Sequence, residues 1–371
     1  MDSKRILVIP HVGSAYGHLI RIGEVLGARY RQAQCVYVAI PKTVSSAAAS
    51  HLPPNVNLLT YDSRPTVTSK TGRFDFQGFL DLFEIDKAFY QVVRPDLIVG
   101  DPGIRAAVLG ERTKTPWQAI MHGCYLPIPT RLISKQFSDI NLRNIATLAW
   151  DLVEEHIDRL LSLVPQGRLP VWRELCRRGQ VLVPNSSYAE PCENATHLGR
   201  KLQKIGFGHG IPFRCVITVC SSGESVIPKD VLIKLAEIYG EVAVIGPTEQ
   251  RPVDGVYYMG STIDVATVVG PETTVFCHGG HGTLRSVGHA RRVIIAPGDV
   301  DQLCNALIAH AYLGMELALG GTWLQRLRAS NPFQRRVDWD GLRKRIEEIS
   351  NEAPINSYST SFDTTVTGLH A

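Results

Sequence analysis

The chain has 371 residues, of which 44% are hydrophobic and 20% are charged, and its formal net charge is +4. This length is enough for two ordinary domains, and the composition is typical of a water-soluble globular protein. Because the net charge is small for this size and Lys and Arg are dispersed, we expect no nucleic-acid partner.

The first half of the chain alternates short apolar strands with helices. The strands are predicted over residues 6–9, 35–40, 97–99 and 117–121. Helices are predicted over residues 19–31 and 80–93, and residues 130–163 are expected to be largely helical. A glycine-rich turn follows the first strand, which is where a parallel sheet of this kind places its ligands.

The second half repeats this pattern. Strands are predicted over residues 215–219, 242–245, 274–277 and 293–296, and helices over 229–239, 284–290 and 340–350. Continuously apolar strands between helices indicate parallel sheets covered on both faces. We therefore predict an α/β protein with two Rossmann-like domains that face a central cleft. The expected limits are residues 1–205 and 206–350, with a flexible polar tail at 351–371.

Eight cysteines are spread along the chain without a CxxC pair, which favours free thiols in a reducing compartment. The apolar stretch at residues 6–9 is too short for a signal peptide, and no apolar run approaches the ~18 residues of a membrane span. We therefore expect a cytoplasmic protein without a membrane-spanning helix. A homodimer is left open.

Residues 277–283, Cys-His-Gly-Gly-His-Gly-Thr, form the most informative segment of the chain. They lie between a predicted strand and a predicted helix. Glycines let the backbone approach a ligand closely, and the start of a helix offers unpaired N–H groups to an anion. We expect His278 to contact a phosphate group, and we expect His281 to lie on a surface loop.

Asp301 and Gln302 follow the next predicted strand and a Pro-Gly turn. An Asp accepts hydrogen bonds and a Gln both donates and accepts, so this pair suits sugar hydroxyls. A diphosphate site beside a polyol site predicts a nucleotide sugar as the ligand. Asp299 and Asp301 also spell a DxD pattern, but nothing else in the sequence accompanies it, and we expect no metal site.

Taken together, these residues resemble the C-terminal signature of glycosyltransferase family 1. The matching positions lie within residues 215–319 and comprise residues 278–283, Pro297, Asp301, Gln302, Asn305, Ala306 and Gly314. The family includes macrolide and plant natural-product glycosyltransferases. The resemblance implies the GT-B fold, inversion of the anomeric centre and no bound metal or cofactor. It also implies a UDP- or dTDP-sugar as co-substrate and a role in natural-product or antibiotic biosynthesis.

The resemblance also implies roles for individual residues. His18, which follows Gly17, would deprotonate a hydroxyl of a small-molecule acceptor, and Asp101 would steady the resulting imidazolium. His11 directly follows the first strand and is an alternative base. The acceptor would be received by the first half and by residues 130–163. The donor would be bound by Ser222, Gly223, His278, Gly279, Gly280, Gly282, Thr283, Asp301 and Gln302.

Two departures from the family pattern bear on the nucleotide. Ser286 stands where members often have a Glu that grips the ribose, and the usual aromatic-proline pair before the motif strand is not evident. Tyr257, Tyr258 or Met259 stand near that position instead. The alternatives are a nucleotide-sugar 2-epimerase or hydrolase of the same fold, and a partner protein that keeps the fold without the activity. A lipid-linked acceptor at a membrane surface is a further alternative.

Overall fold

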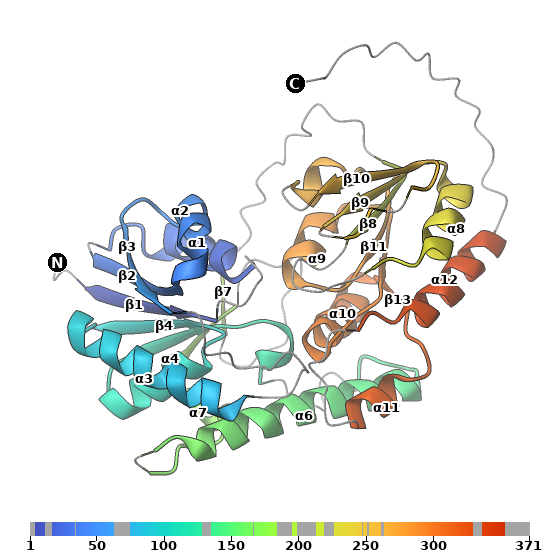
Figure 1. Ribbon diagram of the computed structural model, residues 1–371. Helices are drawn as coiled ribbons and strands as arrows, with labels where there is room; N and C mark the ends of the chain where they lie inside the picture. The colour runs from blue at the N-terminus through green and yellow to red at the C-terminus, as the bar shows by residue number, and fades with distance from the viewer. Residues whose placement is uncertain are drawn as a thin grey trace.

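The computed structural model describes most of the chain. The described residues are 4–11, 17–33, 35–62, 75–127, 135–165, 167–183, 195–198, 213–218, 226–246, 248–250, 252–260, 263–328 and 336–352. They form two parallel sheets, and Figure 1 shows these sheets side by side, each with its own helices.

Seven parallel strands form the first sheet, in the order β3-β2-β1-β4-β5-β6-β7. Their bounds are β1 Arg5–Pro10, β2 Cys35–Pro41, β3 Val56–Tyr61, β4 Leu97–Asp101, β5 Trp117–Ile120, β6 Gln180–Val183 and β7 Ala195–His197. The helices and 3-10 turns of this half are α1 Gly17–Arg29, η1 Lys42–Val44, α2 Ser45–His51, α3 Phe76–Val93, α4 Ile104–Thr113, η2 Gly123–Tyr125, α6 Ile140–Leu163 and α7 Trp172–Arg178.

Six parallel strands form the second sheet, in the order β10-β9-β8-β11-β12-β13. Their bounds are β8 Cys215–Thr218, β9 Val242–Ile245, β10 Val256–Gly260, β11 Thr274–Cys277, β12 Arg292–Ile295 and β13 Glu316–Leu317. The helices and the 3-10 turn of this half are α8 Lys229–Tyr239, η3 Val265–Thr267, α9 His281–Val287, α10 Val300–Leu313, α11 Trp323–Arg328 and α12 Trp339–Asn351.

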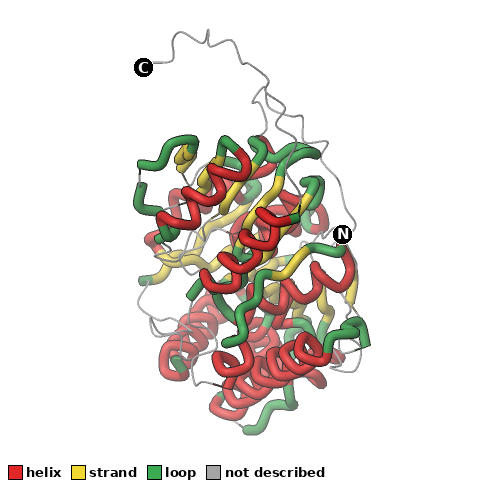
Figure 2. Tube along the Cα trace, turned by 90° about the vertical axis from the view of Figure 1, so that its right-hand side faces the viewer, coloured by secondary structure: helices red, strands yellow, loops and turns green. Residues whose placement is uncertain are grey.

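The central strands are buried along their length because helices cover both faces of each sheet (Figure 2). Every residue of β8, β9 and β11 is buried, as their continuously apolar sequences predict. The predicted fold class, an α/β chain with two parallel sheets, is thus confirmed. The strands of the first sheet all precede residue 198 and those of the second all follow residue 214. Because residues 199–212 and 353–371 lie outside the described part, the exact domain limits and the tail stay predictions.

The long helix α6 connects the two halves. Asp139 caps its start by accepting hydrogen bonds from the N–H groups of Asn141 and Leu142 at 2.6 and 3.4 Å. The helix then runs beneath both halves, and α10 and α11 of the second half pack against it (Figure 1). Trp150 on α6 and Trp323 on α11 belong to one continuous hydrophobic core. The apolar side of α6 thus packs the two halves together, and the expectation that residues 130–163 help to receive an acceptor stays a prediction.

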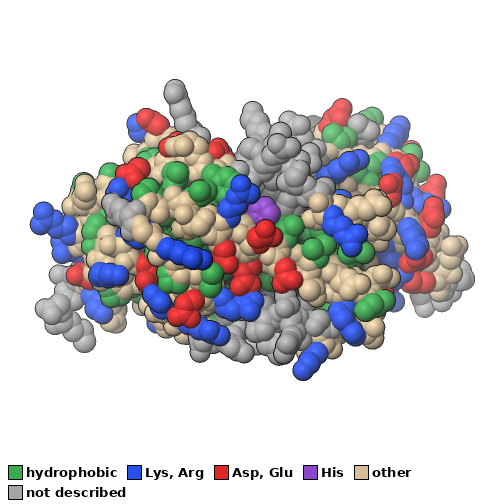
Figure 3. Space-filling model, turned by 90° about the horizontal axis from the view of Figure 1, so that it is seen from below, with side chains coloured by type: hydrophobic (Ala, Val, Ile, Leu, Met, Phe, Trp, Pro, Cys, Tyr) green, Lys and Arg blue, Asp and Glu red, His purple; other side chains and the backbone are tan. Residues whose placement is uncertain are grey.

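The underside of the molecule, along which α6 runs, carries acidic side chains near its middle, with Lys and Arg on either side (Figure 3). On α6, Asp151 and Glu155 are exposed, while Glu154 pairs with Arg173 at 2.7 Å. The described helices include none that is long and apolar enough to cross a membrane. The lipid-linked alternative rested on Arg131, Lys135 and Arg143 beside Leu132 and Ile133. Of these residues, Arg131, Leu132 and Ile133 lie outside the described part.

Candidate active site

Both sheets reverse their strand order at one point, and these two points locate the site. In the first sheet β1 lies between β2 and β4, and in the second sheet β8 lies between β9 and β11. Open parallel sheets bind ligands beyond the carboxyl ends of their strands at such a switch point. His18 follows β1, Asp101 ends β4, and His278 follows β11, so all three lie at a switch point.

His18 and Asp101 are in hydrogen-bond contact. The pairing of β1 with β4 sets Pro10 opposite Asp101, and α1 begins at Gly17, one residue before His18. His18 Nδ1 lies 3.1 Å from Asp101 Oδ1. The side chain of Asp101 is fully buried, whereas that of His18 is 20% exposed. A carboxylate that accepts a hydrogen bond from Nδ1 fixes the orientation of the ring and leaves the other nitrogen, Nε2, able to accept a proton.

Arg21, which our sequence analysis missed, completes this group. Its Nε donates to Asp101 Oδ2 at 2.9 Å and its Nη2 donates to Oδ1 at 3.0 Å. Burial alone would raise the pKa of Asp101, but the Arg21 guanidinium and then His18 outweigh it and hold this pKa well below its ordinary range. Asp101 is therefore an ionised carboxylate. The signal in the sequence was the His-x-x-Arg spacing, which places both side chains on one face of α1.

His11 lies beside the same group. Its ring is edge-on to that of His18, with 5.8 Å between the ring centroids. Its backbone N–H donates to the carbonyl of Asp101 at 2.5 Å, which continues the pairing of β1 with β4. Both histidines thus lie at the switch point, and the choice of base stays a prediction.

His281 reaches this region from the second half. We expected a surface loop residue, and that expectation is wrong, because α9 begins at His281 rather than at residue 284 and His281 is 4% exposed. The cause is Gly280, whose extended backbone caps the helix and whose carbonyl accepts from Leu284 N–H at 3.0 Å. The ring of His281 stacks on that of His122, with 4.7 Å between centroids. Burial, and next the charge of Arg21, lowers the pKa of both histidines well below 6.5.

Asp301 and Gln302 begin α10, and protein groups contact both side chains. Cys124 Sγ donates to Asp301 Oδ1 at 3.4 Å. Gln302 Oε1 accepts from the backbone N–H of Gly298 at 2.8 Å. Asp299 caps α10 by accepting from the N–H of Gln302 at 2.8 Å, so one member of the DxD pattern has a structural function.

Gly123 allows the two halves to meet at this point. Its φ is 54°, a left-handed conformation that favours glycine. A methyl group on Gly123 would lie 2.3 Å from Asn305 Oδ1 and 3.2 Å from Asp301 Oδ1. The first half therefore lies directly against the start of α10, where we predicted that the donor sugar binds.

The glycines of the predicted diphosphate turn differ in what they do. Gly279 has a φ of 82°, and a methyl group there would lie 2.8 Å from the carbonyl oxygen of Gln302, so this glycine is needed for packing. At Gly282 the added methyl would meet no atom of the described residues within 4 Å. His278 and Thr283 are half-buried beside them, and Ser222 and Gly223 lie outside the described residues.

Arg285 and Ser286 follow on α9. Arg285 pairs in a bidentate manner with Glu24 on α1, with Nη–Oε distances of 2.7 and 3.0 Å, and so joins the two halves. Ser286, at the position of the ribose-binding Glu of the resembled family, donates its hydroxyl to the carbonyl of Gly282 at 3.2 Å. The N-terminal end of α9 lies near the His18 group, since His281 interacts electrostatically with Arg21 and Asp101.

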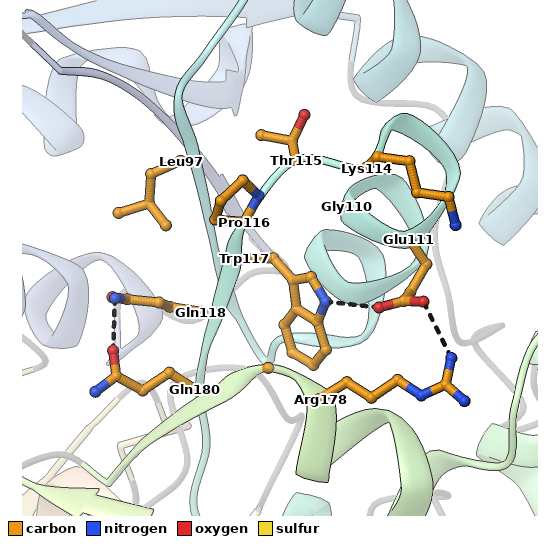
Figure 4. Close-up of a pocket in the computed structure, with 11 residues that line it drawn as sticks. Leu97, Gly110, Glu111, Lys114, Thr115, Pro116, Trp117, Gln118, Arg178 and Gln180 are labelled. Atoms are coloured by element: carbon orange, nitrogen blue, oxygen red, sulfur yellow. Dashed lines mark hydrogen bonds and ion pairs between the residues drawn. The ribbon is translucent and has the colours of Figure 1, made fainter.

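A separate cavity of about 600 Å³ lies at the opposite edge of the first sheet (Figure 4). Leu97, Trp117 and Gln180, the first residues of β4, β5 and β6, line it. Two of its charged groups are paired, since Arg178 lies 3.5 Å from Glu111, which also accepts from the Trp117 indole N–H at 3.3 Å. This cavity is distinct from the site at the carboxyl ends of the strands.

Comparison with known proteins gives structural neighbours only. Neither a protein-family model nor a curated protein matches the sequence. The glycotransferase of kitacinnamycin is 17% identical, covers 95% of this chain and 99% of its own, and superposes with a TM-score of 0.56. The spinosyn forosaminyltransferase SpnP is 14% identical over 94% of this chain and 95% of its own, with a TM-score of 0.55.

Plant enzymes share the same architecture. UGT2 of Phytolacca americana, solved with UDP-2-fluoro-glucose and pterostilbene, is 12% identical over 94% of each chain, with a TM-score of 0.53. At these identities the likeness establishes the fold and leaves the activity to be argued from the site. The chain has the two-sheet GT-B fold of the glycosyltransferases.

Proposed function

We propose that this protein is a glycosyltransferase that moves a sugar from a nucleoside diphosphate to a hydroxyl of a small natural-product acceptor. One observation carries the proposal: a buried, ionised Asp101 holds His18 at the switch point of the first sheet, and His281, the first residue of α9 in the second half, interacts electrostatically with Arg21 and Asp101 of the same group. The GT-B fold supports this assignment, because the solved neighbours of that fold include sugar transferases of natural products.

The proposed reaction needs a base for the acceptor. As the acceptor oxygen attacks the anomeric carbon, His18 Nε2 takes the hydroxyl proton, and Asp101 stabilises the imidazolium that forms. The sugar–phosphate bond breaks, and its electron pair leaves with the nucleoside diphosphate. Attack from the face opposite the diphosphate would invert the anomeric centre.

The leaving diphosphate needs compensation for its negative charge. His278 and the backbone N–H groups around Gly282 at the start of α9 would provide it as preorganised donors, without a metal ion. Asp301 and Gln302 would hold sugar hydroxyls. For Asp301 this means replacing the Cys124 thiol, which is a weak donor, with a stronger hydroxyl donor.

Ligand binding comes first among the tests. UDP, dTDP and GDP should be screened by thermal shift, because a ligand of the native state raises the midpoint of unfolding. The nucleotide that binds then defines a panel of sugar donors, to be incubated with hydroxylated natural products in the presence of EDTA. Glycosylated acceptor with inverted configuration is the expected product, and its absence with every donor that binds would reject the proposal.

The same incubations separate the alternatives. An epimerised donor would identify a nucleotide-sugar 2-epimerase, and free sugar would identify a hydrolase. Failure of every nucleotide to bind would favour a partner protein that keeps the fold without the activity. Ser286 is consistent with this last alternative. Its hydroxyl donates a hydrogen bond within α9, at the position where the resembled family has a Glu that binds the ribose.

A further inference from the structure

His18 Nδ1 has two neighbours of opposite kind. Arg21 Nη2 lies 2.8 Å from it and Asp101 Oδ1 lies 3.1 Å from it. A guanidinium can only donate a hydrogen bond, and an ionised carboxylate can only accept one. A neutral imidazole carries one proton, so Nδ1 bonds either to Asp101 as a donor or to Arg21 as an acceptor. His18 Nε2 can take a proton only in the first arrangement.

Arg21 is already committed to Asp101. Its Nε and Nη2 bind the two carboxylate oxygens in a bidentate pair, and both side chains are at least nine-tenths buried. Away from water, the charge of such a carboxylate has to be compensated by a nearby group. Arg21 provides that compensation, which leaves Oδ1 to accept a further hydrogen bond from His18 without requiring His18 to be charged.

We propose that Arg21 is a positioning residue of this site: it neutralises Asp101, so that His18 is oriented by the carboxylate and yet remains uncharged and able to accept a proton. This inference rests on the proposed function. It adds a residue that lets Asp101 orient His18 through a hydrogen bond while the negative charge of Asp101 is balanced by Arg21. Without Arg21, the buried carboxylate would hold His18 as an imidazolium, which cannot act as a base.

The other titratable groups around His18 do not replace Arg21. His11 follows β1, and His122 and Tyr125 lie at η2. Burial, followed by Arg21, keeps His122 uncharged, and burial raises the pKa of Tyr125 well above 10.0. On the second half, His281 is uncharged for the same reasons as His122, while Asp301 adds negative charge that acts on Arg21. On α1 and α9, the charges of Glu24 and Arg285 are paired with each other.

A second buried pair of the same kind provides a matched control. Arg105 binds Asp86 through Nε at 2.7 Å and Nη2 at 2.5 Å, and both residues are at most 4% exposed. This pair lies between α3 and α4. Among the described residues Arg105 also interacts with Tyr61 and donates to the carbonyl of Pro10 at 3.3 Å, but it contacts no histidine. Removing Arg105 therefore disturbs the fold in a similar way without changing the charge at His18.

The first experiment measures kcat/KM for the best donor and acceptor as a function of pH in the wild type, Arg21→Met, Arg21→Lys and Arg105→Met. For Arg21→Met we expect the acidic limb of the curve of kcat/KM against pH to shift to higher pH by about one unit or more. Activity at neutral pH should then be about tenfold lower and should recover at alkaline pH. Arg21→Lys keeps the positive charge and should restore most of the wild-type limb. Arg105→Met should leave the limb in place. A uniform loss in Arg21→Met with an unshifted limb would overturn the proposal.

The second experiment does not depend on turnover. Histidine labelled with 15N is followed by NMR during a pH titration, and His18→Ala assigns the signal of His18. We expect the His18 signal of the wild type at neutral pH to be that of a neutral ring protonated at Nδ1, and that of Arg21→Met to be that of an imidazolium. If both proteins give the same signal, the inference fails, whereas a wild type that transfers no sugar rejects only the proposed function.

Arg21→Met leaves Asp101 buried without its partner and could fail to fold. In that event Asp101→Asn tests the same balance in the opposite direction. The guanidinium then faces His18 without the carboxylate, so charging His18 should require a lower pH than in the wild type. An unchanged titration of His18 in Asp101→Asn would likewise overturn the proposal.

Discussion

The described residues include two buried Arg–Asp pairs of nearly the same geometry, and one of these two lies at the candidate site. Arg105–Asp86 connects α3 and α4, and Arg21–Asp101 connects α1 to the end of β4. Burial raises the pKa of Asp86 against the pull of Arg105, whereas Arg21 and His18 together lower that of Asp101. The charge and the hydrogen bond of His18 act on Asp101 and have no counterpart among the causes that act on Asp86.

This comparison shows that burial and ion pairing by themselves do not identify a functional carboxylate. Both pairs are buried and bidentate, as structural pairs in a protein interior often are. What distinguishes Asp101 is its position at the switch point and its contact with a partly exposed histidine. The two pairs are therefore expected to differ in their effects on function and on stability.

Replacement of His18 should have the largest effect. We expect His18→Ala to lower kcat by about 10²–10⁴-fold, because a positioned general base contributes a factor of this size. Nucleotide affinity should be nearly unchanged, as measured by thermal shift or calorimetry. His11→Ala is the matched control, and if it loses turnover while His18→Ala retains it, His11 is the base.

Removing the two carboxylates should differ in its effect on both stability and activity. We expect Asp101→Asn to lower the free energy of unfolding at neutral pH by about 3 kcal/mol, since it leaves a buried guanidinium without its counter-charge, and Asp86→Asn to lower it by less, because the pKa of Asp86 is raised. Urea denaturation measures this loss. Turnover of the folded protein should fall only for Asp101→Asn, and an equal fall for Asp86→Asn would mean that the two pairs do not differ in function.

Acid should affect the two pairs in opposite directions. The folded-state pKa of Asp101 is below its ordinary value of 3.8, so its stabilising contribution is present above that value and is lost as the pH falls through the folded value. The pKa of Asp86 is raised, so its contribution is present below 3.8 and is lost as the pH rises through the folded value.

These signs can be measured with the Asn variants, which do not titrate at these positions. As the pH is lowered from about 6 to about 3, the stability advantage of the wild type over Asp101→Asn should shrink, and its advantage over Asp86→Asn should grow. Denaturation series at several pH values test this. Parallel pH dependences for the two differences would contradict the contrast.

The smallest effect is expected at the pair that joins α9 to α1 beside Arg21. Glu24 and Arg285 are 37% and 25% exposed, so solvent screens their attraction. We expect a double-mutant cycle with Glu24→Gln and Arg285→Gln to give a coupling energy of about 0.5 kcal/mol, decreasing with added salt. A coupling of several kcal/mol that is insensitive to salt would show that this pair, like the two buried ones, is effectively shielded from water.

The sequence predicted the elements with a clear apolar pattern and missed those without one. The strands beginning at Arg5, Cys215 and Thr274 were identified because their residues are continuously apolar. β3 was missed because its outer face is exposed at the edge of the sheet and its sequence mixes polar and apolar residues. β13 has two residues, too few for any periodicity.

The site was predictable where local motifs specify it and not where distant segments create it. The motif at residues 278–283 and the pair at residues 301–302 could be read directly from the sequence. The burial of His281 depends on stacking with His122 from the other half, and no local pattern encodes that contact. Arg21 could have been predicted from a local pattern, since its spacing from His18 in the sequence places both residues on one face of a helix.

The hydrophobic core that α6 shares with α10 and α11 has a consequence for how the protein folds and moves. A fragment containing only the second sheet would expose the apolar sides of α10 and α11 to water, so neither half is expected to be stable when expressed alone. The full chain should instead melt in a single cooperative transition. We expect any separation of the sheets that admits a nucleotide to preserve this core and to be centred near α6.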